Sequence, residues 1–293
     1  MRYVGLIGYP VAHSLSPRMQ QAAFEEYGIE ARYVLWETPP DTLPARIETL
    51  RAPGMIGANV TIPYKAKALA LVDECDTLAA RVGALNTIVN RDGRLTGYNT
   101  DVHGFIRALA ESAGHLLSSE KGRRAVIVGT GGAARAAAAG LLENGFEELL
   151  LLGRTEAHLV QLQHDLQRID FLSGSAVRIR ARQFGNSDLA ALFVRTDLLV
   201  NATPVGLHEN DAPLPVDVTL LPTTAVVIDM IFNPPETPLL RAATARGCQT
   251  INGLSMLLYQ GAQAFELWTG LDAPVDAMRK ALSGSQRLQG FLT

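Results

Sequence analysis

Short apolar runs alternate with segments of helical periodicity along the whole chain. In the N-terminal part these patterns predict strands at 2–7, 31–36, 55–61, 85–89 and 94–98, with helices at 17–27, 41–50, 65–72 and 77–82. The last two strands flank the turn Arg91-Asp92-Gly93 and are expected to form a hairpin, which makes the sheet mixed. An amphipathic helix at 102–113 follows, and the polar stretch 114–124 is expected to be the hinge region between two domains.

From residue 125 onward, strands and helices alternate more regularly. The apolar runs predict strands at 125–128, 149–152, 177–181, 198–202, 225–230 and 248–251, and the tail is expected to be helical at 254–268 and 274–282. Strands that alternate with helices favour a doubly wound parallel sheet. The chain is therefore expected to be an α/β protein with a mixed N-terminal unit and a Rossmann-type second unit.

The turn after the strand 125–128 has the spacing of a dinucleotide-binding motif. Gly129, Gly131 and Ala134 fit the pattern G-x-G-x-x-G/A. The first glycine would make the turn, the second would let a pyrophosphate approach, and free amides at the start of the next helix would bind its oxygens. A glycine can also occupy such a turn for the sake of a positive φ alone, so the motif is not decisive by itself.

The end of the following strand favours NADP over NAD. An NAD site would place Asp or Glu there, roughly 20 residues beyond the turn, on the ribose 2′-hydroxyl. The chain has Gly153-Arg154-Thr155 at this point, and a guanidinium matches the oxygens of a 2′-phosphate. The alternative is a solvated loop arginine, but after the glycine motif we interpret Arg154 as a phosphate ligand.

Length, composition and charge narrow the class of protein. The 293 residues suffice for two domains with substantial cores, and 47% of them are hydrophobic. A formal net charge of −3 argues against nucleic acid as a partner. Cys75 and Cys248 lie far apart and outside any Cys/His cluster, so we expect no disulfide framework, no metal site and a cytoplasmic location. Neither a signal peptide nor a membrane span is expected, because no apolar run is long enough.

Polar side chains gather at predicted strand ends and helix starts in the N-terminal unit. Taken one at a time, each has a purely structural explanation: Ser16 and Asp101 could cap helices, and Lys65 could be a surface lysine. Together they place hydroxyl, amide, ammonium and carboxylate groups where α/β proteins bind ligands. These residues are Ser14, Ser16, Asn59, Thr61, Lys65, Asn86, Asn99, Thr100 and Asp101.

Seven segments, in order, resemble the shikimate/quinate dehydrogenase family. They are GYPVAHSLSP (8–17), GANVTIPYK (57–65), GALNTIV (83–89), GYNTDVHGF (97–105), GTGGAARAA (129–137), NATPVGL (201–207) and GLSMLLYQGAQAFELWTG (253–270). The resemblance implies a substrate-binding catalytic domain at 1–104, with the C-terminal helices of 254–293 packing back on it. It also implies an NADP-binding Rossmann domain at 105–253, with the active site in the cleft between the two.

The resemblance further implies a reaction and a set of site residues. The reaction is the NADP-dependent interconversion of shikimate and 3-dehydroshikimate by hydride transfer, in aromatic amino-acid biosynthesis, by a monomer or homodimer without a metal. The substrate would bind Ser14 and Ser16 through its carboxylate, and Thr61, Lys65, Asn86, Asp101 and Gln260 through its hydroxyls. The cofactor would bind Gly129, Gly131, Gly132, Ala133, Arg154, Thr155, Thr203, Gly253 and Met256.

Two of the implied site residues, Gln260 and Met256, could instead have purely structural roles. Gln260 shares a helical stripe with Gln263 and Glu266, which is typical of a solvated face, and Met256 is typical of a core position.

Lys65 and Asp101 are the candidate catalytic residues. Oxidation of a secondary alcohol to a ketone sends a hydride to the nicotinamide while a base takes the hydroxyl proton, and an acid returns it in reverse. We assign Lys65 as the acid/base and Asp101 as its orienting partner, although the sequence alone leaves open which of the two moves the proton.

The chain departs from the family pattern near both ligands. Gln20 and Gln21 stand where the family usually has His-Asn. Phe232 replaces a tyrosine whose hydroxyl helps to bind the substrate carboxylate in the family, which should remove one hydrogen bond worth about 1 kcal/mol. Gly153 replaces the asparagine of an Asn-Arg-Thr motif and His158 stands at a following basic position, so a weaker hold on the 2′-phosphate is expected.

These departures keep alternatives open. One is a quinate/shikimate dehydrogenase that uses NAD as well as NADP. Another is a non-catalytic, NADP-binding regulatory module, which is disfavoured because Lys65 and Asp101 both stand in their motifs.

Overall fold

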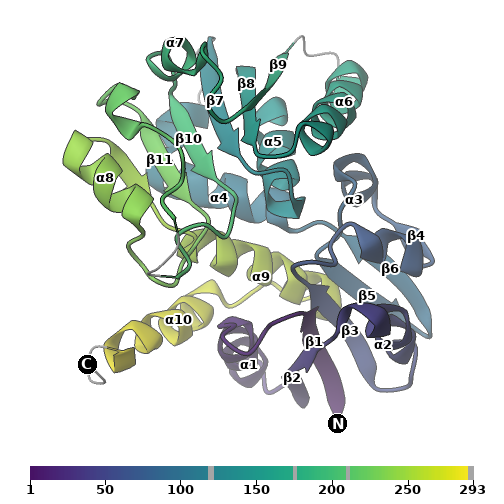
Figure 1. Cartoon of the computed structure of the whole chain (residues 1–293). Coiled ribbons are helices and arrows are strands. Elements are labelled where there is room, and N and C mark those ends of the chain that lie inside the picture. The colour runs from purple at the N-terminus through teal and green to yellow at the C-terminus, as the bar shows by residue number, and fades with distance from the viewer. Residues whose placement is uncertain (118–121, 174–176, 209–211, 290–293) are drawn as a thin grey trace. The chain divides into compact units, whose positions relative to one another are not determined.

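The computed structural model describes residues 1–117, 122–173, 177–208 and 212–289. It divides into two compact units, Met1–Gly104 with Leu257–Thr293 (unit 1) and Phe105–Met256 (unit 2) (Figure 1). The first division falls inside helix α4 (Asp101–Ala113) and the second inside helix α9 (Leu254–Thr269). The hinge expected at 114–124 is therefore misplaced, and its residues 118–121 lie outside the described residues.

Unit 1 is built on a six-stranded mixed sheet of order β2-β1-β3-β5-β6-β4. Strand β1 is parallel to β2 and β3, whereas β5 is antiparallel to β3 and β6, so the hairpin and the mixed sheet are confirmed. The strands are β1 (Arg2–Gly8), β2 (Ala31–Glu37), β3 (Met55–Val60), β4 (Glu74–Cys75), β5 (Thr87–Arg91) and β6 (Arg94–Tyr98). The helices wholly within this unit are α1 (Ser16–Glu26), η1 (Pro40–Thr42), α2 (Leu43–Thr49), η2 (Lys67–Leu71), α3 (Thr77–Val82) and α10 (Val275–Gln289).

The sheet of unit 1 is covered on both faces. One face contributes Ile7, Val60 and Ile88 to a buried cluster that also contains Ile47 of α2 and Tyr64. Helices α1 and α9 pack together through rings, with the centroids of Phe24 and Phe265 5.6 Å apart. Trp268 of α9 donates a hydrogen bond from its indole nitrogen to the Ile88 carbonyl oxygen at 3.0 Å, which ties the helix to the sheet.

Unit 2 is a six-stranded, wholly parallel sheet of order β12-β11-β10-β7-β8-β9. Strand order reverses between β7 and β10, so the predicted doubly wound sheet is confirmed. The strands are β7 (Arg123–Val128), β8 (Phe146–Gly153), β9 (Arg178–Gln183), β10 (Leu198–Asn201), β11 (Val226–Asp229) and β12 (Gln249–Ile251). The helices and turns are η3 (Gly114–Leu117), α5 (Gly132–Glu143), α6 (Glu156–Ser173), α7 (Leu189–Phe193), η4 (Val218–Leu220) and α8 (Pro238–Arg246).

The central strands of unit 2 are buried on both faces, which explains their continuous apolar sequences. Along β7, Ile127 belongs to one buried cluster and Val126 to the other; along β8, Leu151 and Leu150 divide in the same way. Side chains that alternate between two covered faces must all be apolar.

Candidate active site

One edge of the sheet in unit 1 collects most of the predicted substrate residues. Strands β1 and β3 are parallel and end at this edge, whereas the antiparallel β5 begins there. The segments that follow β1 and β3 carry Ser14, Ser16, Thr61 and Lys65, and Asn86 immediately precedes β5. Asp101 begins α4, three residues after β6 returns to the same edge.

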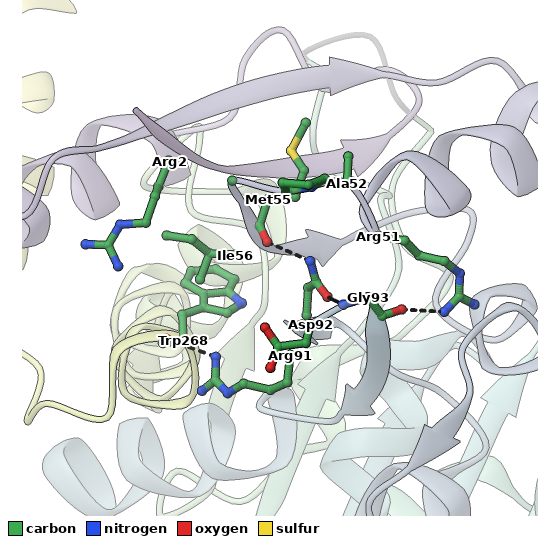
Figure 2. A pocket seen from close by; sticks show the side chains of 12 residues that line it. Arg2, Arg51, Ala52, Met55, Ile56, Arg91, Asp92, Gly93 and Trp268 are labelled. Carbon is green, nitrogen blue, oxygen red and sulfur yellow. Dashed lines mark hydrogen bonds between the residues drawn. The ribbon is translucent and has the colours of Figure 1, made fainter.

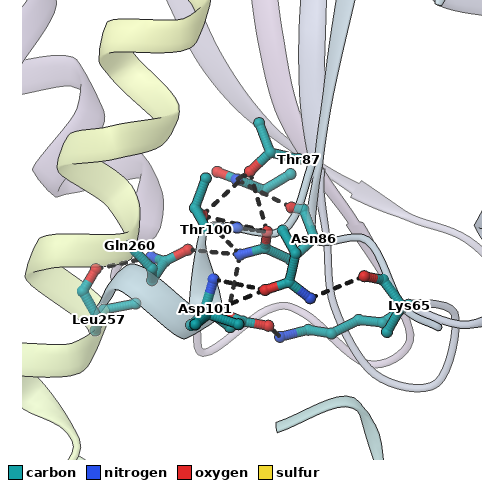
Figure 3. Close-up of polar contacts among 11 residues, drawn as sticks. Lys65, Asn86, Thr87, Thr100, Asp101, Leu257 and Gln260 are labelled. Carbon is teal, nitrogen blue, oxygen red and sulfur yellow. Dashed lines mark hydrogen bonds and ion pairs between the residues drawn. The ribbon is translucent and has the colours of Figure 1, made fainter. Parts of the chain in front are cut away.

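Lys65 and Asp101 form an ion pair within this group, as Figure 3 shows. The Lys65 Nζ atom lies 2.6 Å from Asp101 Oδ2, and the side chains are only 16% and 4% exposed. The other carboxylate oxygen, Oδ1, accepts a hydrogen bond from Asn86 Nδ2 at 3.0 Å. Both oxygens of Asp101 are thus engaged, whereas an ammonium with three N–H bonds keeps two for a bound molecule.

Asn86 has more acceptors around its amide nitrogen than it has hydrogens. Its Nδ2 lies 2.9 Å from Thr100 Oγ1, 3.0 Å from Asp101 Oδ1 and 3.2 Å from Gln260 Oε1. Two N–H bonds cannot serve three acceptors, and the Gln260 oxygen is the most distant of them. Because the Gln260 nitrogen already donates to the Leu257 carbonyl at 2.7 Å, Gln260 offers its oxygen as an acceptor.

The orientation of the Asn86 amide is fixed from the other side. Its Oδ1 accepts from the backbone N–H of Thr100 at 2.7 Å, and the hydroxyls of Thr87 and Thr100 lie 3.3 and 3.2 Å away. Thr87 and Thr100 are fully buried. A flipped amide would turn its nitrogen toward these donors and its oxygen toward Asp101, so the observed orientation is strongly preferred.

Ser16 and Asp101 do not act as the helix caps that their positions in the sequence allowed. The N-cap residue of α1 is Leu15, and Ser16 lies inside the helix with its hydroxyl directed to the Tyr33 hydroxyl. At α4 the cap comes from Asn99, whose Oδ1 accepts from the backbone N–H groups of Asp101 at 3.1 Å and Val102 at 3.2 Å. The Asp101 carboxylate is therefore available to Lys65.

Ser14 and Ser16 lie together at the start of α1. Ser14 Oγ accepts from the Ser16 backbone N–H at 3.2 Å, Ser16 is buried and Ser14 is half-buried. Thr61 is half-buried beyond the end of β3, and its hydroxyl has no hydrogen-bond partner in the described part of the chain. These hydroxyls are suited to an anionic or hydroxylated ligand.

Tyr33 and Thr87 belong to the same network, although neither is among the residues predicted from the sequence. The Tyr33 hydroxyl donates to Asn59 Oδ1 at 2.8 Å, and burial raises the pKa of this phenol while the Ser16 hydroxyl opposes the shift. Asn59 Nδ2 donates in turn to Thr87 Oγ1 at 3.0 Å. The alternation of inward and outward side chains along a strand could have identified Tyr33. In β2, Ala31 and Tyr33 are buried and Arg32 between them is exposed, so the tyrosine faces inward.

The stripe Gln260, Gln263 and Glu266 is not uniformly solvated. Glu266 is exposed, but Gln260 is half-buried and bonded to Asn86, and Gln263 Oε1 is buried without a partner among the described residues. Gln260 therefore lies beside Asn86 in the Lys65–Asp101 group, and its contact with a substrate stays a prediction.

The glycine motif of unit 2 has the form of a phosphate cradle. Gly129 has φ 116°, and a Cβ there would lie 3.0 Å from the Ala202 carbonyl oxygen, so the turns after β7 and β10 approach closely. A Cβ on Gly131 would meet no atom within 4 Å, which leaves room beside the start of α5. This is the point where strand order reverses, and a pyrophosphate fits both the space and the free amides of the helix.

Arg154 is also free to bind a phosphate. It is exposed at the end of β8, and its guanidinium has no partner in the described residues, although its carbonyl oxygen accepts from Gln183 Nε2 at 2.9 Å. Thr155 beside it is exposed as well. The residues present therefore fit a nucleotide with a 2′-phosphate.

The remaining predicted cofactor residues have evident structural functions. Thr203 Oγ1 donates to Asn201 Oδ1 at 2.7 Å and shapes the turn after β10. A Cβ on Gly253 would overlap the Met230 backbone, and Met256 packs against a buried cluster. Their contact with a cofactor stays a prediction.

A pocket of about 490 Å³ lies at the opposite end of the unit 1 sheet (Figure 2). Its arginines are largely used by the fold: Arg51 binds Asp73 at 2.6 Å, and Arg91 donates to the Leu267 carbonyl at the end of α9 at 2.9 Å. The hydrogen bond from Arg51 lowers the pKa of Asp73. This pocket is separate from the Lys65 group, because Arg91 ends the strand that Asn86 precedes.

The described part of the chain holds neither a metal cluster nor a membrane-spanning helix. Across the described ranges, no three His, Cys, Asp or Glu side chains are placed to hold a metal ion, and both cysteines are free. Among the helices of those ranges, none has the length and hydrophobicity needed to cross a membrane.

Two family models match parts of the chain. Residues 6–88 match the shikimate dehydrogenase substrate binding domain, and residues 253–282 match the shikimate 5′-dehydrogenase C-terminal domain. A shikimate dehydrogenase (NADP(+)) of Symbiobacterium thermophilum is 43% identical over 96% of this chain and 93% of its own.

Two solved structures are similar over almost the whole chain. The shikimate 5-dehydrogenase of Thermus thermophilus, in complex with NADP(H) and shikimate, has a TM-score of 0.81 and 38% identity, covering 96% of this chain and 98% of that one. The quinate dehydrogenase of Corynebacterium glutamicum, in complex with NAD, has a TM-score of 0.85 and 30% identity, covering 97% and 99%. On this evidence the chain belongs to the shikimate dehydrogenase family.

Proposed function

We propose that the chain is an NADP-dependent shikimate dehydrogenase, which interconverts shikimate and 3-dehydroshikimate on the route to the aromatic amino acids. The observation that carries this function is the Lys65–Asp101 pair at 2.6 Å, fixed by Asn86. A buried acid/base pair with free N–H bonds suits the proton transfer that accompanies oxidation of an alcohol.

Lys65 is proposed to exchange the proton of the reacting hydroxyl. Its Nζ reaches the substrate oxygen with the N–H bonds that Asp101 leaves unused, and in the reductive direction it donates a proton to the new alkoxide. Asp101 holds the ammonium in place and keeps it from rotating away, and Asn86 holds Asp101. When bound, oxidised NADP would accept the hydride in alcohol oxidation, and reduced NADP would donate it in the reverse reaction.

The substrate is proposed to lie across the edge of the unit 1 sheet. Ser14 and Ser16 bind its carboxylate, and Thr61 and Gln260 bind hydroxyls of the ring. This assignment is supported by the unpaired Thr61 hydroxyl, among the described residues, and by the acceptor oxygen of Gln260, which Asn86 does not fully satisfy.

The cofactor is proposed to bind unit 2. The amides at Gly131, Gly132 and Ala133 hold the pyrophosphate, and Arg154 with Thr155 holds the 2′-phosphate. Support comes from the open space at Gly131 and from the Arg154 guanidinium, which no described residue pairs. Substrate and catalytic residues then belong to unit 1 and cofactor residues to unit 2.

One alternative within the family is oxidation of quinate, or use of NAD. It is favoured by Phe232, which lacks the hydroxyl of the usual tyrosine, and by Gly153 in the phosphate loop. The similarity to a quinate dehydrogenase in complex with NAD also supports this alternative.

Steady-state kinetics with shikimate or quinate and with NADP or NAD tests the function directly. We expect kcat/KM to be highest for shikimate with NADP. If no combination of substrate and cofactor gives turnover, the proposed catalytic function is wrong. Equal kcat/KM with NAD and NADP would contradict the proposed role of Arg154. We also infer that the enzyme works in the cytoplasm as a monomer or homodimer, which sedimentation of the purified protein distinguishes.

A further inference from the structure

Asn59 is a buried polar residue with no assigned part in the reaction. It is 5% exposed, and every polar atom of its side chain is bonded. Its Oδ1 accepts from the Tyr33 hydroxyl at 2.8 Å, and its Nδ2 donates to the Asn86 carbonyl oxygen at 3.2 Å and to Thr87 Oγ1 at 3.0 Å. Burying an amide is costly unless it is fully bonded, so its position is tightly constrained.

The direction of these hydrogen bonds is fixed. The Asn86 carbonyl can only accept, so the Asn59 nitrogen must face it and the Asn59 oxygen must face Tyr33. Thr87 accepts from Asn59 and therefore turns its own hydrogen to Asn86 Oδ1 or Thr100 Oγ1, each 3.3 Å away. Asn59 thus determines which way the buried Thr87 hydroxyl beside Asn86 points.

Asn59 is one of the groups that hold Asn86, which lies just before β5. Its backbone N–H donates to the Tyr98 carbonyl at 3.0 Å, and its own carbonyl accepts from Val60 N–H at 2.8 Å and from Asn59. The Asn86 side chain in turn donates to Asp101. A shift of Asn86 would therefore move the carboxylate that holds Lys65.

We propose that Asn59 is a positioning residue for proton transfer, which holds Asn86 and Thr87 and through them aims Asp101 at Lys65. The inference rests on the proposed function for its kinetic readout. The hydrogen bonds of Asn59 go to Tyr33, Asn86 and Thr87, so it acts through its neighbours. Its link to Tyr33 and Ser16 also joins the group proposed to bind the carboxylate with the group that moves the proton.

The variant Asn59→Asp separates positioning from packing. It keeps the side-chain volume and the acceptor for Tyr33, but it replaces both N–H donors by a second oxygen that faces the Asn86 carbonyl. The matched control is Asn90→Asp. Asn90 lies in β5 of the same sheet, donates to the Met55 carbonyl at 2.8 Å and accepts from Gly93 N–H at 2.8 Å, so the control also keeps an acceptor and loses a donor.

Both variants are assayed for kcat, for KM of shikimate and NADP, and for the pH dependence of kcat. We expect Asn59→Asp to lower kcat about tenfold or more, to displace the pH profile and to leave KM for NADP within about twofold. Asn90→Asp should change none of these. Equal effects of the two variants, or a loss confined to KM for NADP, would overturn the proposal.

Further measurements test the proposal even if Asn59→Asp does not fold or the wild type does not oxidise shikimate. Tyr33→Phe removes one of the three hydrogen bonds that hold Asn59 and should shift kcat and its pH profile in the same direction as Asn59→Asp; unchanged values would contradict the proposal. In the ligand-free protein, the side-chain amide NMR signals of Asn86 should move in Tyr33→Phe and stay in place in Asn90→Asp. Those signals test the positioning even if the wild type does not oxidise shikimate, whereas absent turnover would count against the proposed function alone.

Discussion

Replacing Lys65 separates the catalytic from the structural contribution of its ion pair. Lys65→Met keeps most of the side-chain length but removes the charge that lies 2.6 Å from Asp101. General acid–base catalysis typically contributes 10²- to 10⁴-fold, so we expect kcat for shikimate oxidation to fall about 10³-fold. Binding of shikimate should weaken less, because the proposed contacts from Ser14 and Gln260 remain.

The same substitution leaves a carboxylate buried without its counter-ion. Asp101 is 4% exposed, and Asn86 is its remaining side-chain donor among the described residues. Removal of one partner from a buried pair costs about 3–5 kcal/mol. Lys65 is 16% exposed, so water can enter where the ammonium stood, and we expect a loss of about 3 kcal/mol in the free energy of unfolding. Adding Asp101→Asn removes the unpaired charge and should recover most of this loss.

Steady-state kinetics tests the catalytic contribution and urea unfolding tests the stability contribution, in Lys65→Met, Asp101→Asn and the double variant. Asp101→Asn alone should lower kcat about 10- to 150-fold, because a charge-assisted hydrogen bond is worth about 1.5–3 kcal/mol. If Asp101 acts through Lys65, the double variant has the kcat of Lys65→Met. Multiplicative losses would show that the two act independently, and kcat within tenfold of wild type in Lys65→Met would refute its acid/base role. A double variant no more stable than Lys65→Met would refute the electrostatic account.

Three further predictions concern unit 2. Arg154→Ala should raise KM for NADP about tenfold or more and leave KM for NAD unchanged, as measured by initial rates; equal changes would contradict the phosphate contact. Phe232→Tyr should lower KM for shikimate about fivefold, because one added hydrogen bond contributes about 1 kcal/mol. An unchanged KM would show that position 232 does not contact the substrate carboxylate. Burial raises the pKa of Asp229, so its protonated form stabilises the fold at low pH and this contribution is lost as pH rises through the folded pKa. The free energy of unfolding of wild type relative to Asp229→Asn should therefore fall with rising pH, and a difference that rises would reverse the assignment.

The sequence predicted the fold well because its strongest signals are local. Continuous apolar runs such as 125–128 are typical of strands covered on both faces, and the hairpin at Arg91-Asp92-Gly93 indicated the mixed sheet. The boundary between units was harder, because it lies inside the helix Asp101–Ala113 and leaves no break in the amphipathic pattern. The polar composition of 114–124 predicted a hinge there, whereas the family resemblance implied a first domain of 1–104.

The candidate site was predictable where motifs gather polar residues and was incomplete elsewhere. Asn86, Lys65 and Asp101 were named from their segments, and their hydrogen bonds bring them together. Tyr33 was missed because an inward tyrosine in a strand resembles any core aromatic until its hydroxyl finds a partner. Hydrogen-bond direction, which decides the role of Asn59, cannot be obtained from spacing at all.

The amide nitrogen of Asn86 faces three acceptors with two hydrogens, and this shortage has a consequence for selectivity. A ligand hydroxyl that donates to the Gln260 oxygen would supply the missing donor, whereas an analogue without that hydroxyl would leave this oxygen without it. Sites that reject a ligand through an unmet hydrogen bond discriminate far more strongly than sites that only measure its size. In the free protein the Asn86 amide is therefore one N–H short of its three acceptors, and we propose that a ring hydroxyl of the substrate supplies the missing donor.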